Sequence, residues 1–497
     1  MGSLGEWRYR GEGSQNLVLS HDDDAGTGVD GGRLEGTAVR VRKRRCDGEE
    51  YALRGAWPRI MDSEEGARGH PPPREPLHGL VMECLRKVLD QGHPAFAVVT
   101  PEWLAGLVAV ADLMNPGPGE GWDGEKESAV YYAYRDRVLS PLLGAEYVPW
   151  SVPVSVDREA LQAVENYLNT HEVSAERPPK FREQGPVQLD AGIGIVHLMP
   201  DLKARRPSGF QDGGEGVVHV FELKPKCGFL PTSPLMDPRT AQLKRRHSSY
   251  VMQQRLKMKG GSIQEVSGYD PLDLFSGRRD RISSALSALA QCPQNNFSRV
   301  DVDTASGLSK ELTWDGDDSE WTCVLQALAD ALVKAPLLGR LRTAQEALDG
   351  MDVEGVGRCF MRLFPEKDDV SCDSSHNIPL TGRRGEAATC VDAAHPAVAR
   401  CLMCMFLTKT VLKDVSIVVR LRRLGEGNGI QENCIVAEDA GGRRYEAVLS
   451  VLDLDVKPAN RIPLYLEKDR AIVSAFADAE APEEGQRKLP ILFPPEG

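Results

Sequence analysis

Apolar residues recur at two spacings along the chain, and these spacings predict alternating strands and helices. Short runs rich in β-branched residues, with glycine or polar residues between them, predict strands. Such runs lie at 7–19 (strand, glycine turn, strand), 37–41, 148–156, 191–199, 217–224, 415–421 and 446–454. Apolar residues three or four positions apart predict helices at 77–89, 103–113, 131–143, 158–168, 321–351 (broken at Pro336) and 397–410. The sequence therefore predicts a mixed α+β fold.

The segments between these elements divide the chain. Residues 47–74, 115–126 and 370–389 are polar or rich in glycine and proline, and the last dozen residues are rich in Pro and Glu, so we expect loops there. A chain of 497 residues can bury a large core, and we expect two lobes. We assign the N-terminal lobe to 1–199, with a glycine-rich loop and an insertion at about 46–126, and the C-terminal lobe to 200–497.

Charge and cysteine usage narrow the class of protein. A net charge of −13 argues against a general nucleic-acid binder, but a small polyanion needs only a local basic pocket. Basic residues are densest at 39–45 and 243–259, although a solvated basic face explains an isolated cluster equally well. Eleven scattered cysteines suggest free thiols in a reducing compartment. With no run of 18 apolar residues and no signal-peptide pattern, we expect an intracellular protein in the cytoplasm, the nucleus or both, with no membrane partner.

The string FELKPKCGFLP at 221–231 delivers three charges to the end of a predicted strand. Period-two alternation would place Glu222, Lys224 and Lys226 on one face, and Pro225 should end the strand because it cannot donate to a ladder. On spacing alone, a solvated strand end is an equally good interpretation.

Two further segments place acids beside predicted strands. Asp414 comes directly before one strand, and Asp453 and Asp455 follow another, ahead of Lys457. Phosphoryl transfer needs a metal held by carboxylates, cations around the phosphates and a positioned hydroxyl. A single Asp at a strand end is more often a turn former, so neither segment decides the function alone.

Taken in order, these motifs resemble those of the inositol-pentakisphosphate 2-kinase family, and they extend from Trp7 to Tyr465. That family transfers a phosphoryl group from ATP to the 2-hydroxyl of inositol 1,3,4,5,6-pentakisphosphate and forms inositol hexakisphosphate (phytate). The resemblance implies an ATP- and magnesium-dependent phosphotransferase with an alcohol acceptor. It also implies a two-lobed inositol-polyphosphate kinase fold, distantly protein-kinase-like, with antiparallel sheets flanked by helices. We expect a monomer that binds inositol pentakisphosphate and ATP and no nucleic acid.

The resemblance also assigns roles to residues. It implies nucleotide contacts from Gly13, Ser14, Gln15, Asn16, Arg40, Pro200, Asp201, Leu202, Glu222 and Arg299. It implies Asp414 as the base, Lys224 at the reacting phosphate, Asp453 as a magnesium ligand and Asp455 as a second acid that could bind the metal. It implies substrate contacts from Arg177, Lys224, Lys226, Lys257, Asn295, Asn296, Lys457, Arg461 and Tyr465. Pro458 and Pro463 predict a short turn or loop around the last three rather than a long helix.

The chain departs from the family pattern in two places. Gln253 stands where a histidine is often found, and Ser298 stands where an arginine is usual, with Arg299 one place later. A one-residue bulge would restore Arg299 to that role.

A structural zinc, found in some plant members, remains an open question for this chain. Its candidate ligands do not have the spacing of that site: Cys372, His376, Cys390, His395, Cys401 and Cys404. For Cys401 and Cys404, buried thiols in a helix are the favoured interpretation.

Two other classes of function compete with the kinase. Gln253 and the shifted Arg299 are the only support for a catalytically weak inositol-polyphosphate sensor or scaffold. A protein kinase is disfavoured, since the chain has no His-Arg-Asp and no Asp-Phe-Gly motif.

Overall fold

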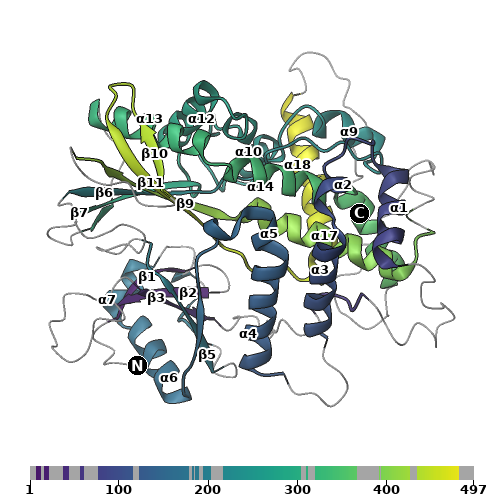
Figure 1. Ribbon diagram of the computed structural model, residues 1–497, viewed down its shortest axis with the longest axis horizontal. Helices are drawn as coiled ribbons and strands as arrows, with labels where there is room; N and C mark the ends of the chain where they lie inside the picture. Colours follow the sequence, from purple (N-terminus) through teal and green to yellow (C-terminus); the bar gives the residue numbers. More distant parts are fainter. Residues whose placement is uncertain are drawn as a thin grey trace.

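The computed structural model describes residues 7–12, 16–21, 37–43, 56–60, 76–115, 122–177, 182–183, 185–189, 194–202, 216–303, 309–311, 319–365, 391, 393–425 and 434–480. These residues form two antiparallel sheets flanked by helices (Figure 1). The predicted mixed α+β fold is confirmed.

The N-terminal sheet has five strands in the order β1 (Trp7–Glu12), β2 (Asn16–His21), β3 (Thr37–Arg42), β5 (Ile195–Pro200) and β4 (Val152–Ser155). Its apolar side chains, such as Val39 and Val41, pack against helix α6 (Arg158–Leu168). Asp157 caps α6 by accepting a hydrogen bond from the Ala160 N–H at 2.7 Å. This small core is separate from the main one.

The C-terminal sheet has six strands in the order β10 (Ile435–Glu438), β11 (Arg444–Leu452), β9 (Ser416–Arg423), β6 (Val217–Leu223), β7 (Phe297–Asp303) and β8 (Ser309–Glu311). Phe221 and Leu223 belong to the main hydrophobic core on one face. Val218 and Val220 alternate with them and pack on the other face against Leu202, which follows β5. Residues on the two faces alternate because side chains along a strand point to opposite sides.

The main core is built around α17 (Pro396–Asp414), which is buried along most of its length. The other described helices are α1 (Leu77–Val88), α2 (Ala95–Val98), α3 (Pro101–Leu113), α4 (Gly124–Ala133), η3 (Tyr134–Leu139), α5 (Ser140–Leu143), η4 (Ala145–Tyr147), α7 (His171–Glu176), α9 (Pro238–Lys244), α10 (Ser249–Lys259), α11 (Pro271–Leu274), α12 (Arg279–Gln291), α13 (Ser319–Lys334), α14 (Leu337–Leu348), α15 (Asp352–Leu363), η5 (Ala459–Arg461) and α18 (Ile462–Glu480). Both α1 and α3 contact α17, so the described part of the 46–126 insertion shares the main core. The lobe boundary at 199/200 stays a prediction.

Most predicted elements are present, and two details are wrong. β6 ends at Leu223, and Lys226 has a positive φ of 63°, so Glu222, Lys224 and Lys226 do not share a strand face. The segment around Pro463 is the start of the 19-residue helix α18 rather than a short turn. Proline is tolerated there because the first helical N–H groups have no partner within the helix.

The predicted loop at 370–389 and the last dozen residues lie outside the described part of the chain. Among the described residues, no single helix is long and apolar enough to cross a membrane, and only the bent pair α13 and α14 reaches that length and composition together.

Candidate active site

The string FELKPKCGFLP at 221–231, called the signature below, continues beyond the end of β6 and is held in place by hydrogen bonds to residues distant in the sequence. The Lys224 N–H donates to the Asn296 carbonyl at 2.8 Å, and the Tyr269 hydroxyl donates to the Pro225 carbonyl at 2.8 Å. Gln345 of α14 is fully buried; its amide donates to the Lys226 and Leu412 carbonyls, each at 2.9 Å, and accepts from the Gly228 N–H at 2.9 Å. Gln345 therefore holds the signature beside the end of α17, two residues before Asp414. Nothing in the sequence singled it out.

Gly228 is required by the same packing. A Cβ atom at this position would lie 2.3 Å from the Phe275 ring. The string therefore combines half-buried charged residues with a glycine that lets the turn approach the end of α11.

Asp414 lies at the C-terminal end of α17, near lysines from five different segments. Their charges interact with it or with one another: Lys224, Lys226, Lys257, Lys413, Lys457 and Lys468. Within the described residues, none of these six ammonium groups has an ion pair or a hydrogen bond, whereas lysines such as Lys87, Lys244 and Lys409 are paired. These six residues, called the lysine cluster below, carry more positive charge than Asp414, the one acid that the described residues place among them, can balance.

The pKa values reflect this crowding. Burial would raise the pKa of Asp414, but attraction to Lys413, Lys457, Lys226 and Lys468 outweighs it, so the pKa lies below its ordinary value. Burial lowers the pKa of Lys226 to about 8, and repulsion by Lys224 adds to the effect. Asp414 is accordingly ionised at neutral pH, and Lys226 loses its proton more readily than a surface lysine does.

A group of carboxylates lies at the end of β11. Asp453 adopts a left-handed backbone conformation (φ 64°), and its Oδ2 accepts a hydrogen bond from the Ser416 hydroxyl at 2.7 Å. Burial raises the pKa of Asp453, and the negative charges of Glu222 and Asp455 add to the rise, against the opposing effects of Ser416 and Lys224. Glu222 and Asp455 thus lie near enough to Asp453 for their charges to act on it, and carboxylate oxygens are the donors that Mg²⁺ prefers. Among the described residues, the oxygens of these three acids do not come as close together as those of Asp352, Glu354 and Asp469.

Arg40 joins the two sheets at this point. Its guanidinium on β3 forms an ion pair with Asp455, and it lies 5.3 Å from the centre of the Tyr131 ring. Burial alone would lower the pKa of Arg40, but the attraction of Asp455 and Tyr131 outweighs it and raises the pKa. Arg40 is therefore held charged beside the carboxylates.

The remaining nucleotide residues are only partly described. Gly13, Ser14 and Gln15 lie outside the described residues, and Asn16 begins β2. Pro200 ends β5, and the next two residues, Asp201 and Leu202, are buried between the sheets.

Arg299 does not lie with these residues. The pairing of β6 with β7 is continuous from Val217–Asp303 to Leu223–Phe297, so the bulge expected next to Ser298 is absent. Ser298 pairs with Glu222, whereas Arg299 pairs with Phe221 and points to the opposite face. There its guanidinium binds Asp301 at 2.6 and 2.8 Å and lies 4.9 Å from the Trp321 ring. Without a bulge, Arg299 does not take the place of Ser298 on the face of Glu222, and its contact with the nucleotide stays a prediction.

The other predicted substrate residues are spread over several elements. Arg177 follows α7 and donates to the Gly185 carbonyl at 3.1 Å. Asn295 is exposed, while Asn296 is buried and donates to the Tyr250 hydroxyl at 3.1 Å. Arg461 lies in η5, and Tyr465 lies in the first turns of α18.

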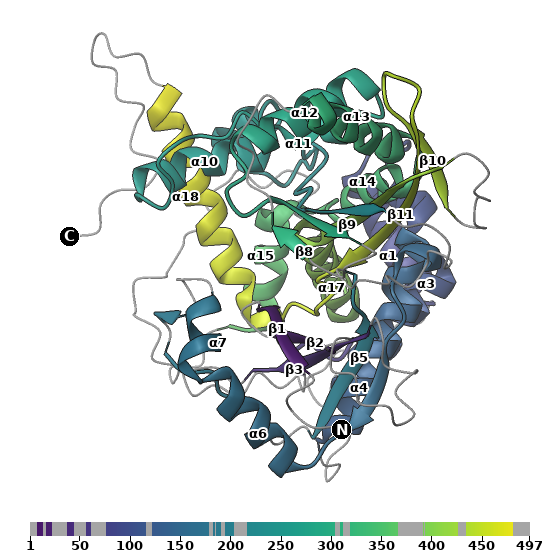
Figure 2. The same ribbon diagram turned by 90° about the vertical axis from the view of Figure 1, so that its left-hand side faces the viewer.

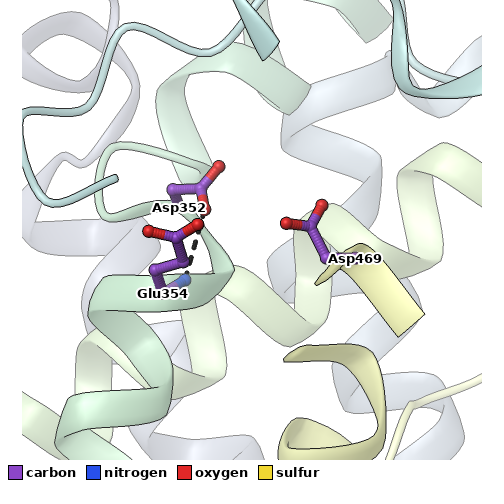
Figure 3. A group of neighbouring side chains, drawn as sticks. All are labelled: Asp352, Glu354 and Asp469. Carbon is purple, nitrogen blue, oxygen red and sulfur yellow. Dashed lines mark hydrogen bonds between the residues drawn. The ribbon is translucent and has the colours of Figure 1, made fainter. Parts of the chain in front are cut away.

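A second group of acids resembles a metal site but is filled by a lysine. Asp352, Glu354 and Asp469 lie together (Figure 3). The buried Lys244 ammonium contacts them at 2.7, 3.7 and 2.9 Å respectively. This cluster is a buried ion-pair network that ties α9 to α15 and α18.

For zinc, only three candidates fall within the described residues. Cys401 and Cys404 are buried thiols in α17, and burial raises the pKa of both. His395 caps the same helix, its Nδ1 accepting from the Ala397 N–H at 3.2 Å. The interpretation of Cys401 and Cys404 as buried thiols is confirmed. Cys372, His376 and Cys390 lie outside the described residues.

Comparison with known proteins agrees with this geometry. The sequence profile described as inositol-pentakisphosphate 2-kinase matches residues 9–471. The chain belongs to the inositol-pentakisphosphate 2-kinase family. It is 25% identical over 492 residues to the inositol-pentakisphosphate 2-kinase of Arabidopsis thaliana, covering 95% of this chain and 93% of that protein.

Two further relatives extend the comparison. The rice protein (Oryza sativa subsp. indica) named inositol-pentakisphosphate 2-kinase IPK1 is 27% identical over 494 residues, covering 96% of this chain and 94% of the relative. The Danio rerio inositol-pentakisphosphate 2-kinase is 34% identical over 164 residues, which is 33% of this chain and 31% of that protein. The family and the names of its members indicate a kinase, and the sensor or scaffold alternative is not favoured.

Proposed function

We propose that this family member transfers the γ-phosphoryl group of ATP to the 2-hydroxyl of inositol 1,3,4,5,6-pentakisphosphate, and that the lysine cluster binds the substrate phosphates. The observation that carries the proposal is the set of six lysines near Asp414, none of which has an ion pair or a hydrogen bond from its ammonium group within the described residues. A folded protein does not gather so many unpaired cations without cost, because like charges repel and desolvation penalises them. A ligand with five phosphates would balance them.

In this proposal Asp414 is the base. Its depressed pKa keeps it ionised, so it can accept the proton of the attacking hydroxyl while the new oxygen–phosphorus bond forms and the bond from the γ-phosphorus to ADP breaks. Lys224 follows the end of β6, and its charge acts both on Lys226 and on Asp453. This supports a place for its ammonium at the transferred phosphate. Lys226, Lys257 and Lys457 would then hold phosphates that do not react.

The carboxylates beside β11 are proposed to hold magnesium. Asp453, with Asp455 as a second ligand, offers the oxygen donors that Mg²⁺ prefers, and Ser416 orients Asp453. Magnesium, when bound, neutralises the charge that develops on the phosphate oxygens. Arg40 and Glu222 adjoin this group and are proposed to contact ATP, whose adenine would lie near Pro200, Asp201 and Leu202.

We also propose that the protein acts as a monomer inside the cell. The chain's net charge of −13 supports a protein that avoids nucleic acid, and its scattered cysteines support a reducing compartment.

The test is turnover by the purified full chain. It is incubated with ATP, Mg²⁺ and a panel of inositol phosphates, and the products are separated by chromatography. We expect inositol hexakisphosphate from the pentakisphosphate and stoichiometric ADP. If another inositol phosphate is turned over and the pentakisphosphate is not, the proposed substrate is wrong.

A further inference from the structure

Two lysines of the cluster, Lys413 and Lys468, were not singled out by the sequence. Lys468 lies on α18, seven residues after Arg461 and three after Tyr465. At 3.6 residues per turn Tyr465 and Lys468 share one face of α18, and Ile472 continues the same stripe. Ile472 is buried against Met252 of α10, which fixes the direction in which this face of α18 points.

The packing of α18 brings Lys468 to Lys257. Helices α10 and α18 contact one another along their length, and Figure 2 shows α18 (yellow) beside α10 on one side of the molecule. Repulsion from Lys468, added to burial, lowers the pKa of Lys257. In turn, burial and Lys413 lower the pKa of Lys468, which Asp414 opposes. The two ammonium groups thus come from different helices and repel one another, and neither has an ion pair or a hydrogen bond among the described residues.

Lysines that lie beside these two are paired with acids of α18. Lys259, two residues after Lys257, also reaches across to α18, where its ammonium binds Asp478 at 3.2 Å. Lys244 likewise meets Asp469, the neighbour of Lys468. Acids of α18 therefore pair with Lys259 of α10 and with Lys244 of α9, while Lys257 and Lys468 have no ion pair among the described residues.

We propose that Lys468 is a further substrate ligand, which together with Lys257 binds one phosphate of inositol pentakisphosphate from opposite sides and so helps to set the substrate range. The inference rests on the proposed function. Two cations that converge without an anion are the arrangement that recognises a phosphate, since each can donate a charge-assisted hydrogen bond to a different oxygen. Removing one donor then weakens both the binding of that phosphate and the value of the other donor.

The experiment compares Lys468→Met, Lys257→Met, the double variant and the control Lys259→Met. Steady-state kcat and KM are measured for inositol pentakisphosphate and for each inositol tetrakisphosphate that lacks one of its phosphates. We expect Lys468→Met to lower kcat/KM for the pentakisphosphate by about tenfold or more, mainly through KM, since a hydrogen bond between charged groups is lost. For the one tetrakisphosphate that lacks the bound phosphate, we expect no loss.

The double variant should lose less than the product of the two single effects, because both lysines bind the same phosphate. Lys468→Arg keeps the charge and should keep most of the affinity, and Lys259→Met should match the wild type. Equal losses for every tetrakisphosphate would mean a general effect of charge and would overturn the proposal, as would an unchanged KM in Lys468→Met. An inactive wild type would instead overturn the proposed function. Thermal melts of all variants exclude unfolding as the cause of any loss.

Discussion

The ammonium of Lys226 predicts how substrate capture depends on pH. Burial, with repulsion from Lys224, Lys413 and Lys257, lowers the pKa of Lys226 to about 8, and Asp414 only partly opposes the effect. A group with this pKa is charged in about nine molecules of ten at pH ~7 and in about one of ten at pH ~9. If the charged form binds a substrate phosphate, the free enzyme loses a ligand over this range.

The size of the expected fall in kcat/KM follows from the free energy that the contact between Lys226 and a substrate phosphate contributes. A hydrogen bond between charged groups contributes about 1.5–3 kcal/mol, so its loss weakens capture by about tenfold or more. We therefore expect kcat/KM for inositol pentakisphosphate to fall by about tenfold between pH ~7 and pH ~9, since kcat/KM reports the pKa values of the free enzyme. The profile of kcat should be flatter, because bound phosphates raise the pKa of Lys226 again.

The assay is steady-state release of ADP at saturating ATP, with each profile divided by its own maximum. Lys226→Arg is the decisive variant, since a guanidinium stays charged throughout this range and should remove the alkaline fall. Lys259→Met, whose lysine is paired with Asp478, should keep the fall of the wild type. If Lys226→Arg shows the same alkaline fall, another group or the substrate itself is responsible, and the reasoning about Lys226 is refuted.

Three further outcomes are expected from single substitutions. Asp414→Asn should lower kcat by about a hundredfold to ten-thousandfold, because it removes the base. It should also lower KM for the pentakisphosphate, because it removes the one anion that the described residues place within the lysine cluster. A raised KM would argue against this placement of Asp414. Asp453→Asn should abolish transfer without lowering the melting temperature at neutral pH, because the raised pKa means that folding disfavours the ionised form there; measurable turnover would remove Asp453 from the mechanism. Lys244→Met should lower the free energy of unfolding by about 3–5 kcal/mol in denaturant titrations, because it leaves two buried acids and the half-buried Asp469 without their cation. The control Lys259→Met, which removes a surface ion pair, should change the free energy of unfolding by about 0.5 kcal/mol at most. Equal effects of these last two variants would contradict the role of the buried network.

The order of strands and helices could be predicted because it follows from local patterns. The β-branched runs and the three-to-four spacing of apolar residues identify most of the described elements. The prediction failed around Pro463, since a proline pattern alone does not distinguish a turn from the first turn of a helix. Helix α18 owes its length to packing against α10 and α15, which are distant in the sequence.

The charged residues of the site were largely predictable, but the way they are brought together was not. Glu222, Lys224 and Lys226 were expected on one strand face, whereas the strand ends early and a left-handed residue redirects the chain. Gln345 holds that turn from another helix, so its role depends on tertiary packing and has no local signal.

Lys468 and Arg299 illustrate the same limit from opposite sides. Lys468 joins the lysine cluster because α18 packs on α10, although its local sequence resembles an ordinary charged helix. Arg299 stands one residue from the expected position, and because side chains alternate along a strand, that single step sends it to the other face of the sheet.

The most direct test of the central claim is the identity of the product that the full chain makes from ATP and inositol pentakisphosphate. Nuclear magnetic resonance of the purified product assigns the position of the new phosphate. We predict one inositol hexakisphosphate, phosphorylated at the former 2-hydroxyl, with one ADP for each molecule formed and none from Asp453→Asn. Tight binding of the pentakisphosphate with no ADP and no new phosphate would contradict the account.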